Sequence, residues 1–153
     1  MIIEVEGEHA TKQLGERIGA TLKGGEVFQL IGDVGAGKTT FVKGLAKGLG
    51  IDDDIQSPSF TISRTYAARD DIQLVHYDFY RLSDAGIMAN ELEENIHDPT
   101  TVTVIEWADI VEGVLPARHV SLQFTAPTET ARTITLSDEL SDSLKGYKDD
   151  FTA

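Results

Sequence analysis

The chain contains, at residues 32–39, the stretch Gly32-Asp33-Val34-Gly35-Ala36-Gly37-Lys38-Thr39, which has the pattern G-x-x-x-x-G-K-T. Directly before it, residues 27–31 form a short apolar run that follows two glycines, which is typical of a buried strand in a parallel sheet. Directly after it, residues 40–49 place apolar side chains at helical spacing, and Gly50 is suited to end the helix. A strand, this stretch and a helix in that order predict a phosphate-binding P-loop.

Each residue type in the P-loop has a chemical reason. Glycines let successive backbone N–H groups converge on phosphate oxygens, and the positive end of the following helix attracts the anion. The Lys38 ammonium is expected to reach the β- and γ-phosphates, and the Thr39 hydroxyl to ligate Mg²⁺. We therefore expect the chain to bind a nucleoside triphosphate together with Mg²⁺. The expected nucleotide-binding residues are Gly32, Asp33, Val34, Gly35, Ala36, Gly37, Lys38, Thr39 and Thr40.

The length and composition indicate a single globular domain and exclude several classes of protein. A chain of 153 residues is expected to form one domain, and no apolar run is long enough to span a membrane. The absence of cysteine excludes disulfides, thiolate metal sites and cysteine nucleophiles. The first residues lack the basic start and apolar core of a secretion signal. Together with the absence of cysteine and the need for cellular nucleotide, this favours a cytoplasmic location.

The charge is strongly acidic, with 26 Asp and Glu against 13 Lys and Arg and a formal net charge of −13. Affinity for nucleic acid comes mainly from Lys and Arg contacts to phosphate, so direct binding of free tRNA is not expected. The acidic surface fits general solubility and also fits docking on a basic partner.

The remaining hydrophobic patterns predict an α/β protein. Strands are predicted at residues 2–6, 60–66, 72–77, 102–106, 119–124 and 132–136, and helices at residues 10–22, 84–95 and 108–114. The strands at 60–66 and 72–77 flank a polar turn and predict an antiparallel hairpin. We predict the three-layer P-loop NTPase fold over residues 1–136, with a central parallel sheet extended by antiparallel strands. An acidic tail at residues 137–153 is expected to be frayed.

Two carboxylates end predicted strands where a nucleotide site needs them. Asp78 ends one apolar strand and Glu106 ends another, and such strand ends face the P-loop in sheets of this class. Either one alone can be an ordinary cap or a solvated side chain. Together with Thr39 they predict a site for a metal ion and the attacking water, and the sequence leaves open which of them is base and which is metal ligand.

Two further features lie near these positions. The loop Ser57-Pro58-Ser59-Phe60-Thr61 is rich in hydroxyl groups, which fits a switch segment that senses the γ-phosphate and equally fits a turn stiffened by proline. Trp107 directly follows Glu106, and its ordinary role is packing. His76 lies in the strand that Asp78 ends, and the other histidines show no ligand spacing.

Four motifs together resemble a known family. In order and spacing, the chain is similar to the TsaE family, also called YjeE, over the region from the N-terminal helix to about Leu136. The motifs are Gly32-Asp33-Val34-Gly35-Ala36-Gly37-Lys38-Thr39-Thr40-Phe41-Val42, Ser57-Pro58-Ser59-Phe60-Thr61, His76-Tyr77-Asp78-Phe79-Tyr80-Arg81 and Ile105-Glu106-Trp107. The resemblance implies a bacterial ATPase required for threonylcarbamoyladenosine modification of tRNA, working with the proteins TsaB and TsaD, of which TsaD transfers the threonylcarbamoyl group.

The resemblance also implies roles for individual residues. Lys38 and Thr39 would bind phosphate and metal, Asp78 would be a catalytic or metal-linked acid, and Glu106 a carboxylate of the metal site. Thr61, with Ser57 and Ser59 beside it, would belong to the switch region. The chain has Val34 where leucine is common and Ser59 where threonine is common, and both changes are mild.

Two other classes share the P-loop. A small-molecule kinase needs an acceptor pocket and usually an arginine-bearing lid, whereas the arginines after residue 50 are scattered along this chain. A nucleotide-dependent binding module without hydrolysis is disfavoured by the intact pair Asp78 and Glu106. Guanine specificity is not expected because the chain contains no Asn-Lys-x-Asp string.

Overall fold

One mixed sheet lies at the centre of the computed structural model, which describes residues 1–33, 35–56, 58, 62–80, 82, 86, 88–116 and 119–137. The strands are β1 (Ile2–Glu6), β2 (Val27–Ile31), β3 (Ser63–Ala67), β4 (Gln73–Asp78), β5 (Thr101–Glu106), β6 (Val120–Thr125) and β7 (Ala131–Leu136). Their order across the sheet is β1-β7-β6-β2-β5-β4-β3. The central strands β6, β2, β5 and β4 are parallel, whereas β3 at one edge and β7 and β1 at the other pair antiparallel. The predicted sheet is therefore confirmed.

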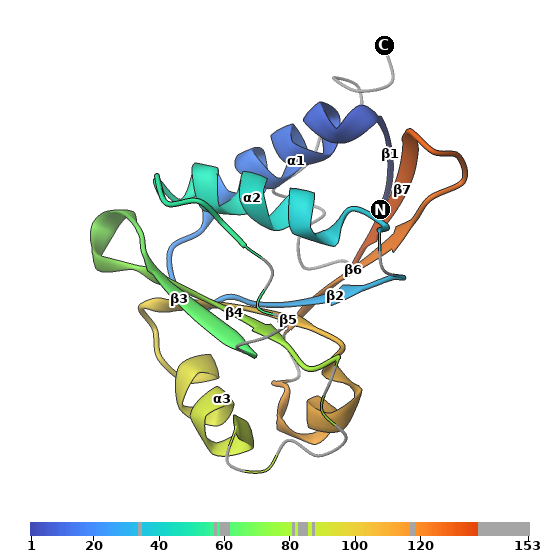
Figure 1. Cartoon of the computed structure of the whole chain (residues 1–153). Helices are drawn as coiled ribbons and strands as arrows, with labels where there is room; N and C mark the ends of the chain where they lie inside the picture. The colour runs from blue at the N-terminus through green and yellow to red at the C-terminus, as the bar shows by residue number, and fades with distance from the viewer. Residues whose placement is uncertain are drawn as a thin grey trace.

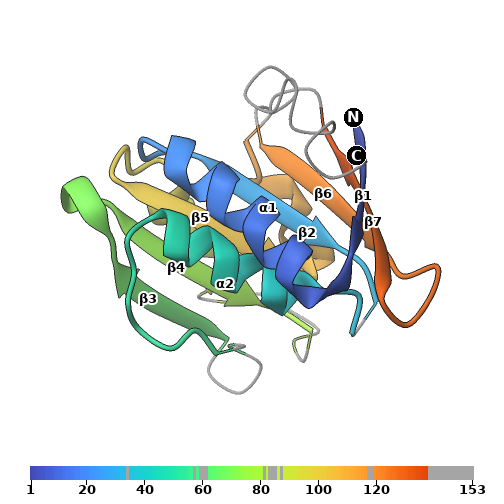
Figure 2. The same ribbon diagram turned by 90° about the horizontal axis from the view of Figure 1, so that it is seen from above.

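Helices cover both faces of the sheet and complete three layers (Figure 1). Helices α1 (Gly7–Thr21) and α2 (Lys38–Gly48) lie side by side on one face, as the view in Figure 2 also shows. Helix α3 (Met88–Ile96) and the 3-10 helix Ala108–Val114 lie on the other. Side chains of the strands alternate between the two layers: Leu74 packs in the α1–α2 core, and its neighbour Val75 in the α3 core.

Helices α1 and α2 are in direct backbone contact because glycines face each other. Gly15 and Gly19 of α1 lie against Gly44 and Gly48 of α2. A Cβ atom added at Gly15 would overlap the carbonyl oxygen of Phe41, and similar overlaps arise at the other three glycines. The start of α1 is thereby held in a fixed position relative to the P-loop, from which α2 begins.

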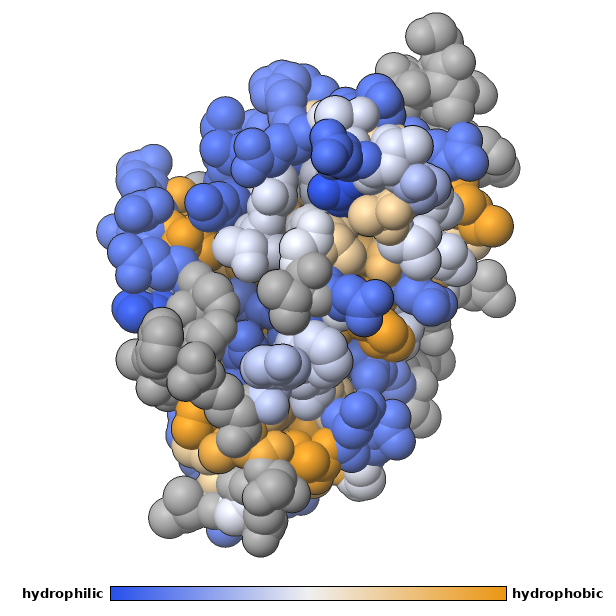
Figure 3. All heavy atoms as spheres, turned by 45° about the vertical axis from the view of Figure 1, so that its right-hand side comes forward, coloured by the Kyte–Doolittle hydropathy of each residue, from blue (hydrophilic) through white to orange (hydrophobic). Residues whose placement is uncertain are grey.

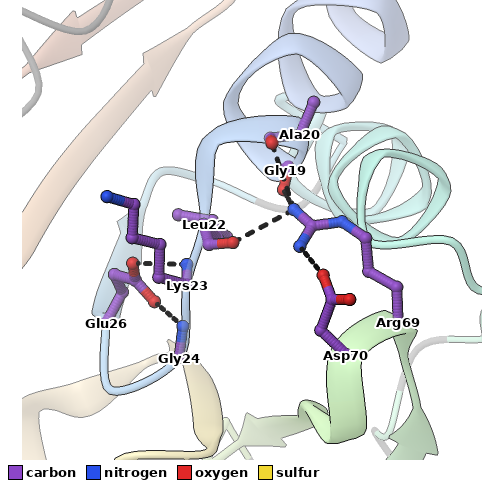
Figure 4. Close-up of polar contacts among 8 residues, drawn as sticks. All are labelled: Gly19, Ala20, Leu22, Lys23, Gly24, Glu26, Arg69 and Asp70. Carbon is purple, nitrogen blue, oxygen red and sulfur yellow. Dashed lines mark hydrogen bonds and ion pairs between the residues drawn. The ribbon is translucent and has the colours of Figure 1, made fainter.

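The hairpin of β3 and β4 is fastened to the end of α1 by Arg69 (Figure 4). Its guanidinium Nη2 donates to the carbonyl oxygens of Gly19, Ala20 and Leu22 at 3.0, 3.1 and 3.0 Å. Gly19 and Ala20 belong to the last turn of α1, whose carbonyls lack the regular helical donors, and Arg69 supplies donors to them. Nη1 also pairs with Asp70 at 3.1 Å. The hairpin that supplies Asp78 is thus tied to the layer that carries the P-loop.

Some helices begin at other residues than predicted, and some predicted boundaries fall on residues that the structure does not describe. Helix α1 begins at Gly7 instead of residue 10, and α2 begins at Lys38 instead of residue 40. The predicted starts of β3 at residue 60 and of α3 at residue 84 fall outside the described residues, as does the acidic tail from residue 138 onward. In the described part of the chain, no helix has the length and apolar character needed to cross a bilayer. On the face shown in Figure 3, hydrophilic residues predominate and hydrophobic ones form separate patches.

Candidate functional site

The P-loop connects β2 to α2 in a backbone conformation that requires glycine. Gly35 and Gly37 have φ angles of 85° and 105°, which L-amino acids with side chains rarely adopt. A Cβ at Gly35 would meet nothing within 4 Å, so the conformation alone requires glycine there, and the space beside it is open. Val34 lies outside the described residues. The loop therefore exposes its backbone next to the N-terminus of α2, which is the geometry of an anion site.

Lys38, the first residue of α2, is 6% exposed and is surrounded by acceptors. Its Nζ donates to the carbonyl oxygen of Gly32 at 2.7 Å and lies 3.8 Å from Glu106 Oε1. The same nitrogen lies 4.3 Å from the centre of the Trp107 ring, within the range of a cation–π contact. The ammonium group thus lies at the mouth of the loop between a carbonyl, a carboxylate and an aromatic face.

Asp78 and Glu106 lie side by side because they end neighbouring parallel strands in register. Both are buried, at 6% and 3% exposure. The backbone N–H of Tyr80 donates to Asp78 Oδ1 at 2.9 Å, and Glu106 Oε2 lies 2.6 Å from His76 Nε2. The structure therefore brings the two predicted carboxylates together with Lys38, and their chemical roles stay predictions.

These residues line one cavity of about 600 Å³. Of the predicted nucleotide-binding residues, Gly35, Gly37, Lys38, Thr39 and Thr40 line it. Gly32, Asp33 and Ala36 shape the loop instead: the carbonyl of Gly32 accepts from Lys38, and that of Asp33 accepts from the N–H of Ala36 at 3.1 Å. The predicted switch residues Ser57, Ser59 and Thr61 lie outside the described residues.

The cavity has walls that the sequence did not indicate. They come from the start of α1, from the connection between β6 and β7 and from the start of β7, through Gly7, Glu8, Thr11, Glu129, Thr130 and Arg132. Arg132 Nη1 donates to the carbonyls of Thr128 and Glu129, each at 3.1 Å, and Nη2 lies 3.4 Å from the carbonyl of Gly35. No local motif marks these residues, and only the strand order places them beside the P-loop.

An aromatic pair forms another part of the cavity wall. Tyr80 is 58% exposed, and its ring centre lies 4.8 Å from that of Trp107. Trp107 itself has a φ angle of 57°, an uncommon conformation for a residue with a large side chain. The expectation that Trp107 serves packing is incomplete, because its ring also lies over Lys38. Tyr80 belongs to the quoted motif at residues 76–81, which was the one sequence signal for it.

The model of the family described as "Threonylcarbamoyl adenosine biosynthesis protein TsaE" matches residues 5–134. The chain belongs to the TsaE family. TsaE of Bacillus subtilis is 38% identical over 128 residues, which are 83% of this chain and 78% of that protein. TsaE of Treponema pallidum is 38% identical over 127 residues, which are 83% of this chain and 93% of that protein. The family resemblance drawn from the four motifs is confirmed.

A solved structure supports the TsaE fold. The crystal structure of Bacillus subtilis YdiB superposes with a TM-score of 0.74 at 30% identity, covering 98% of this chain and 95% of that one. The α/β fold with its mixed sheet is therefore that of a known structure.

Proposed function

We propose that this TsaE-family chain is an ATPase that acts in tRNA threonylcarbamoyladenosine biosynthesis on a complex of TsaB and TsaD. One observation carries the proposal: Lys38, Thr39, Asp78 and Glu106 line a single cavity at the P-loop. A lysine, a hydroxyl and two carboxylates at the mouth of a P-loop are the groups that phosphoryl chemistry uses. The family description supplies the pathway.

The cavity fits a nucleotide. Its volume of about 600 Å³ is in the range of small-molecule sites, and the start of α2 and the open backbone at Gly35 suit phosphate oxygens. Lys38 is almost fully buried and lines the cavity, which suits the binding of phosphate there.

The same lining fits Mg²⁺ bound together with the nucleotide. Among the described residues, the cavity has carboxylates at Glu8, Asp78, Glu106 and Glu129 but cations only at Lys38 and Arg132. A triphosphate adds negative charge to this excess, so a divalent cation is needed to balance it. No group of three or more ligating side chains that could hold a metal alone occurs in the described residues. Thr39, Asp78 and Glu106 would hold it in part, as is usual for Mg²⁺, with the remaining ligands from phosphate and water.

Lys38, Asp78 and Glu106 have different roles in the proposed hydrolysis. Lys38 positions the terminal phosphates and neutralises charge on them, and bound Mg²⁺ supplies further neutralisation. One of Asp78 Oδ and Glu106 Oε orients the attacking water and accepts its proton. The burial of both carboxylates keeps bulk water from them.

The proposed protein partners are inferred from the net charge of the chain and from its membership of the TsaE family. A net charge of −13 disfavours contact with tRNA, so the chain reaches the RNA pathway through proteins, and TsaB and TsaD are the proposed ones. We propose that hydrolysis is slow in the isolated chain and that the chain acts in the cytoplasm, where ATP and tRNA are available.

The fate of the γ-phosphate tests the enzymatic part of the proposal. Wild type incubated with ATP and Mg²⁺ is expected to release inorganic phosphate slowly, with no phosphorylated acceptor. Lys38→Ala should weaken ATP binding in calorimetry by about tenfold or more, because it removes the cation at the loop, and thermal unfolding checks that the fold persists. Unchanged ATP affinity in Lys38→Ala would contradict the assignment of the P-loop. Transfer of phosphate to a metabolite would instead support a small-molecule kinase.

A further inference from the structure

His76 is fully buried, yet its ring contacts Glu106 of the candidate site through a hydrogen bond. It lies on β4 two positions before Asp78, with 0% exposure, and does not line the cavity. Its Nε2 lies 2.6 Å from Glu106 Oε2. Its Nδ1 is buried and has no hydrogen-bond partner among the residues that the structure describes.

The carboxylate partner assigns Nε2 of His76 as the donor in this contact. A carboxylate oxygen only accepts hydrogen bonds, so Nε2 carries the proton and donates it to Glu106. His76 therefore acts as a hydrogen-bond donor aimed at one oxygen of Glu106.

The other oxygen of Glu106 lies within ion-pair range of the P-loop lysine but beyond hydrogen-bond distance. Glu106 Oε1 lies 3.8 Å from Lys38 Nζ, longer than the 2.7–2.9 Å of a hydrogen-bonded ion pair. Lys38 instead donates to the carbonyl of Gly32 at 2.7 Å. All three side chains are almost completely buried, where a direct pair between carboxylate and ammonium would be strong. The bond to His76 opposes that pair, because it holds the carboxylate at its far oxygen.

We propose that His76 is a positioning residue that holds the Glu106 carboxylate away from Lys38 and so keeps Lys38 available to the phosphates of a nucleotide. The proposal rests on the proposed nucleotide site. Without His76, the buried carboxylate loses its donor and turns to Lys38, whose Nζ lies 3.8 Å from Oε1. A direct bond to Glu106 then strengthens this ion pair and occupies a donor of Lys38, so the lysine attracts phosphate less.

Two variants separate positioning from packing. His76→Leu fills a similar volume and removes the donor, whereas the amide of His76→Gln can place an N–H near the position of Nε2. In calorimetry with ATP, His76→Leu is expected to weaken binding by about tenfold, the scale of one charge-assisted hydrogen bond, and His76→Gln to stay within about threefold of wild type. Equal weakening in both folded variants overturns the proposal, and so does wild-type affinity in His76→Leu.

A double-mutant cycle tests whether His76 acts through Glu106. In the background Glu106→Gln no carboxylate is present to pair with Lys38, so His76→Leu should change ATP affinity by less than about twofold. An undiminished effect in that background shows a packing role and overturns the proposal. If His76→Leu does not fold, His76→Asn replaces it, because its shorter amide does not reach the position of Nε2.

A readout without nucleotide separates this inference from the proposed function. In a crystal structure of His76→Leu, which lacks the donor, the distance between Lys38 Nζ and the nearest Glu106 oxygen is expected to fall from 3.8 Å to about 2.8 Å. An unchanged distance overturns the positioning role. A shortened distance in a chain whose wild type binds no ATP would support the positioning role and refute the nucleotide site.

Discussion

At the scale of residues, the site is organised around one ammonium group. Lys38 is held by the Gly32 carbonyl, and Glu106 and Trp107 lie close to it without displacing it. Asp78 lies beside Glu106 because the two residues are in register at the ends of parallel strands. Lys38, Asp78 and Glu106 are thereby held close together by the ends of β4 and β5 and the start of α2.

The two carboxylates carry the first prediction. Asp78→Asn and Glu106→Gln should each lower ATP turnover by about tenfold to a thousandfold, the range for loss of a positioned acid, base or electrostatic group. Both replacements keep the size of the side chain, and Asn can still accept from the N–H of Tyr80. Phosphate release measures turnover, and calorimetry checks that ATP still binds. Wild-type turnover in either variant would reduce that residue to a structural role.

At the scale of elements, the contact between α1 and α2 connects packing to the site. The start of α1 supplies Gly7, Glu8 and Thr11 to the cavity, and α2 begins at the P-loop. The glycines between the helices leave no space for side chains, so any added atom must push the helices apart.

Gly15→Ala therefore tests the helix contact. It should lower the free energy of unfolding by about 2 kcal/mol or more, because the new Cβ meets backbone atoms of α2. Gly113→Ala is the matched control: a Cβ there meets nothing within 4 Å, so its stability should change by less than about 1 kcal/mol. Urea denaturation measures both. Equal effects in the two variants would show that the added Cβ at Gly15 does not disturb the packing of α1 against α2.

The elements also show how far the sequence could predict this structure. Strands β1 and β2 match their predicted residues because alternating or continuous apolar runs specify them. Helix α1 starts three residues early because Gly7, with a φ of 84°, turns the chain directly from β1 into the helix, and apolar spacing does not report this.

The same distinction holds within the site. Asp78 and Glu106 could be predicted as neighbours, since parallel strands end at one edge of the sheet. The partnership of His76 with Glu106 depends on side-chain geometry across two strands. The place of Arg132 depends on the strand order β7-β6-β2, which no local pattern encodes. Contacts between distant segments are thus the part that the sequence alone left unpredicted.

At the scale of the whole molecule, the net negative charge predicts that the chain does not bind tRNA directly. With 13 more acidic than basic residues, the isolated chain should show no binding to bare tRNA up to about 100 µM at physiological salt, because few cations are available to replace counterions. Fluorescence anisotropy with labelled tRNA measures this. A dissociation constant of a few micromolar that weakens with salt would show a direct RNA surface.

We propose that the P-loop cavity hydrolyses ATP and that this hydrolysis acts on a protein partner. The most direct measurement is the steady-state rate of phosphate release by the chain alone and with TsaB and TsaD from the same source. If the proposal holds, release is slow alone and at least several-fold faster with both partners, and ATP strengthens the complex, because docking and nucleotide binding are coupled reciprocally. An unchanged rate together with no complex would contradict the claim.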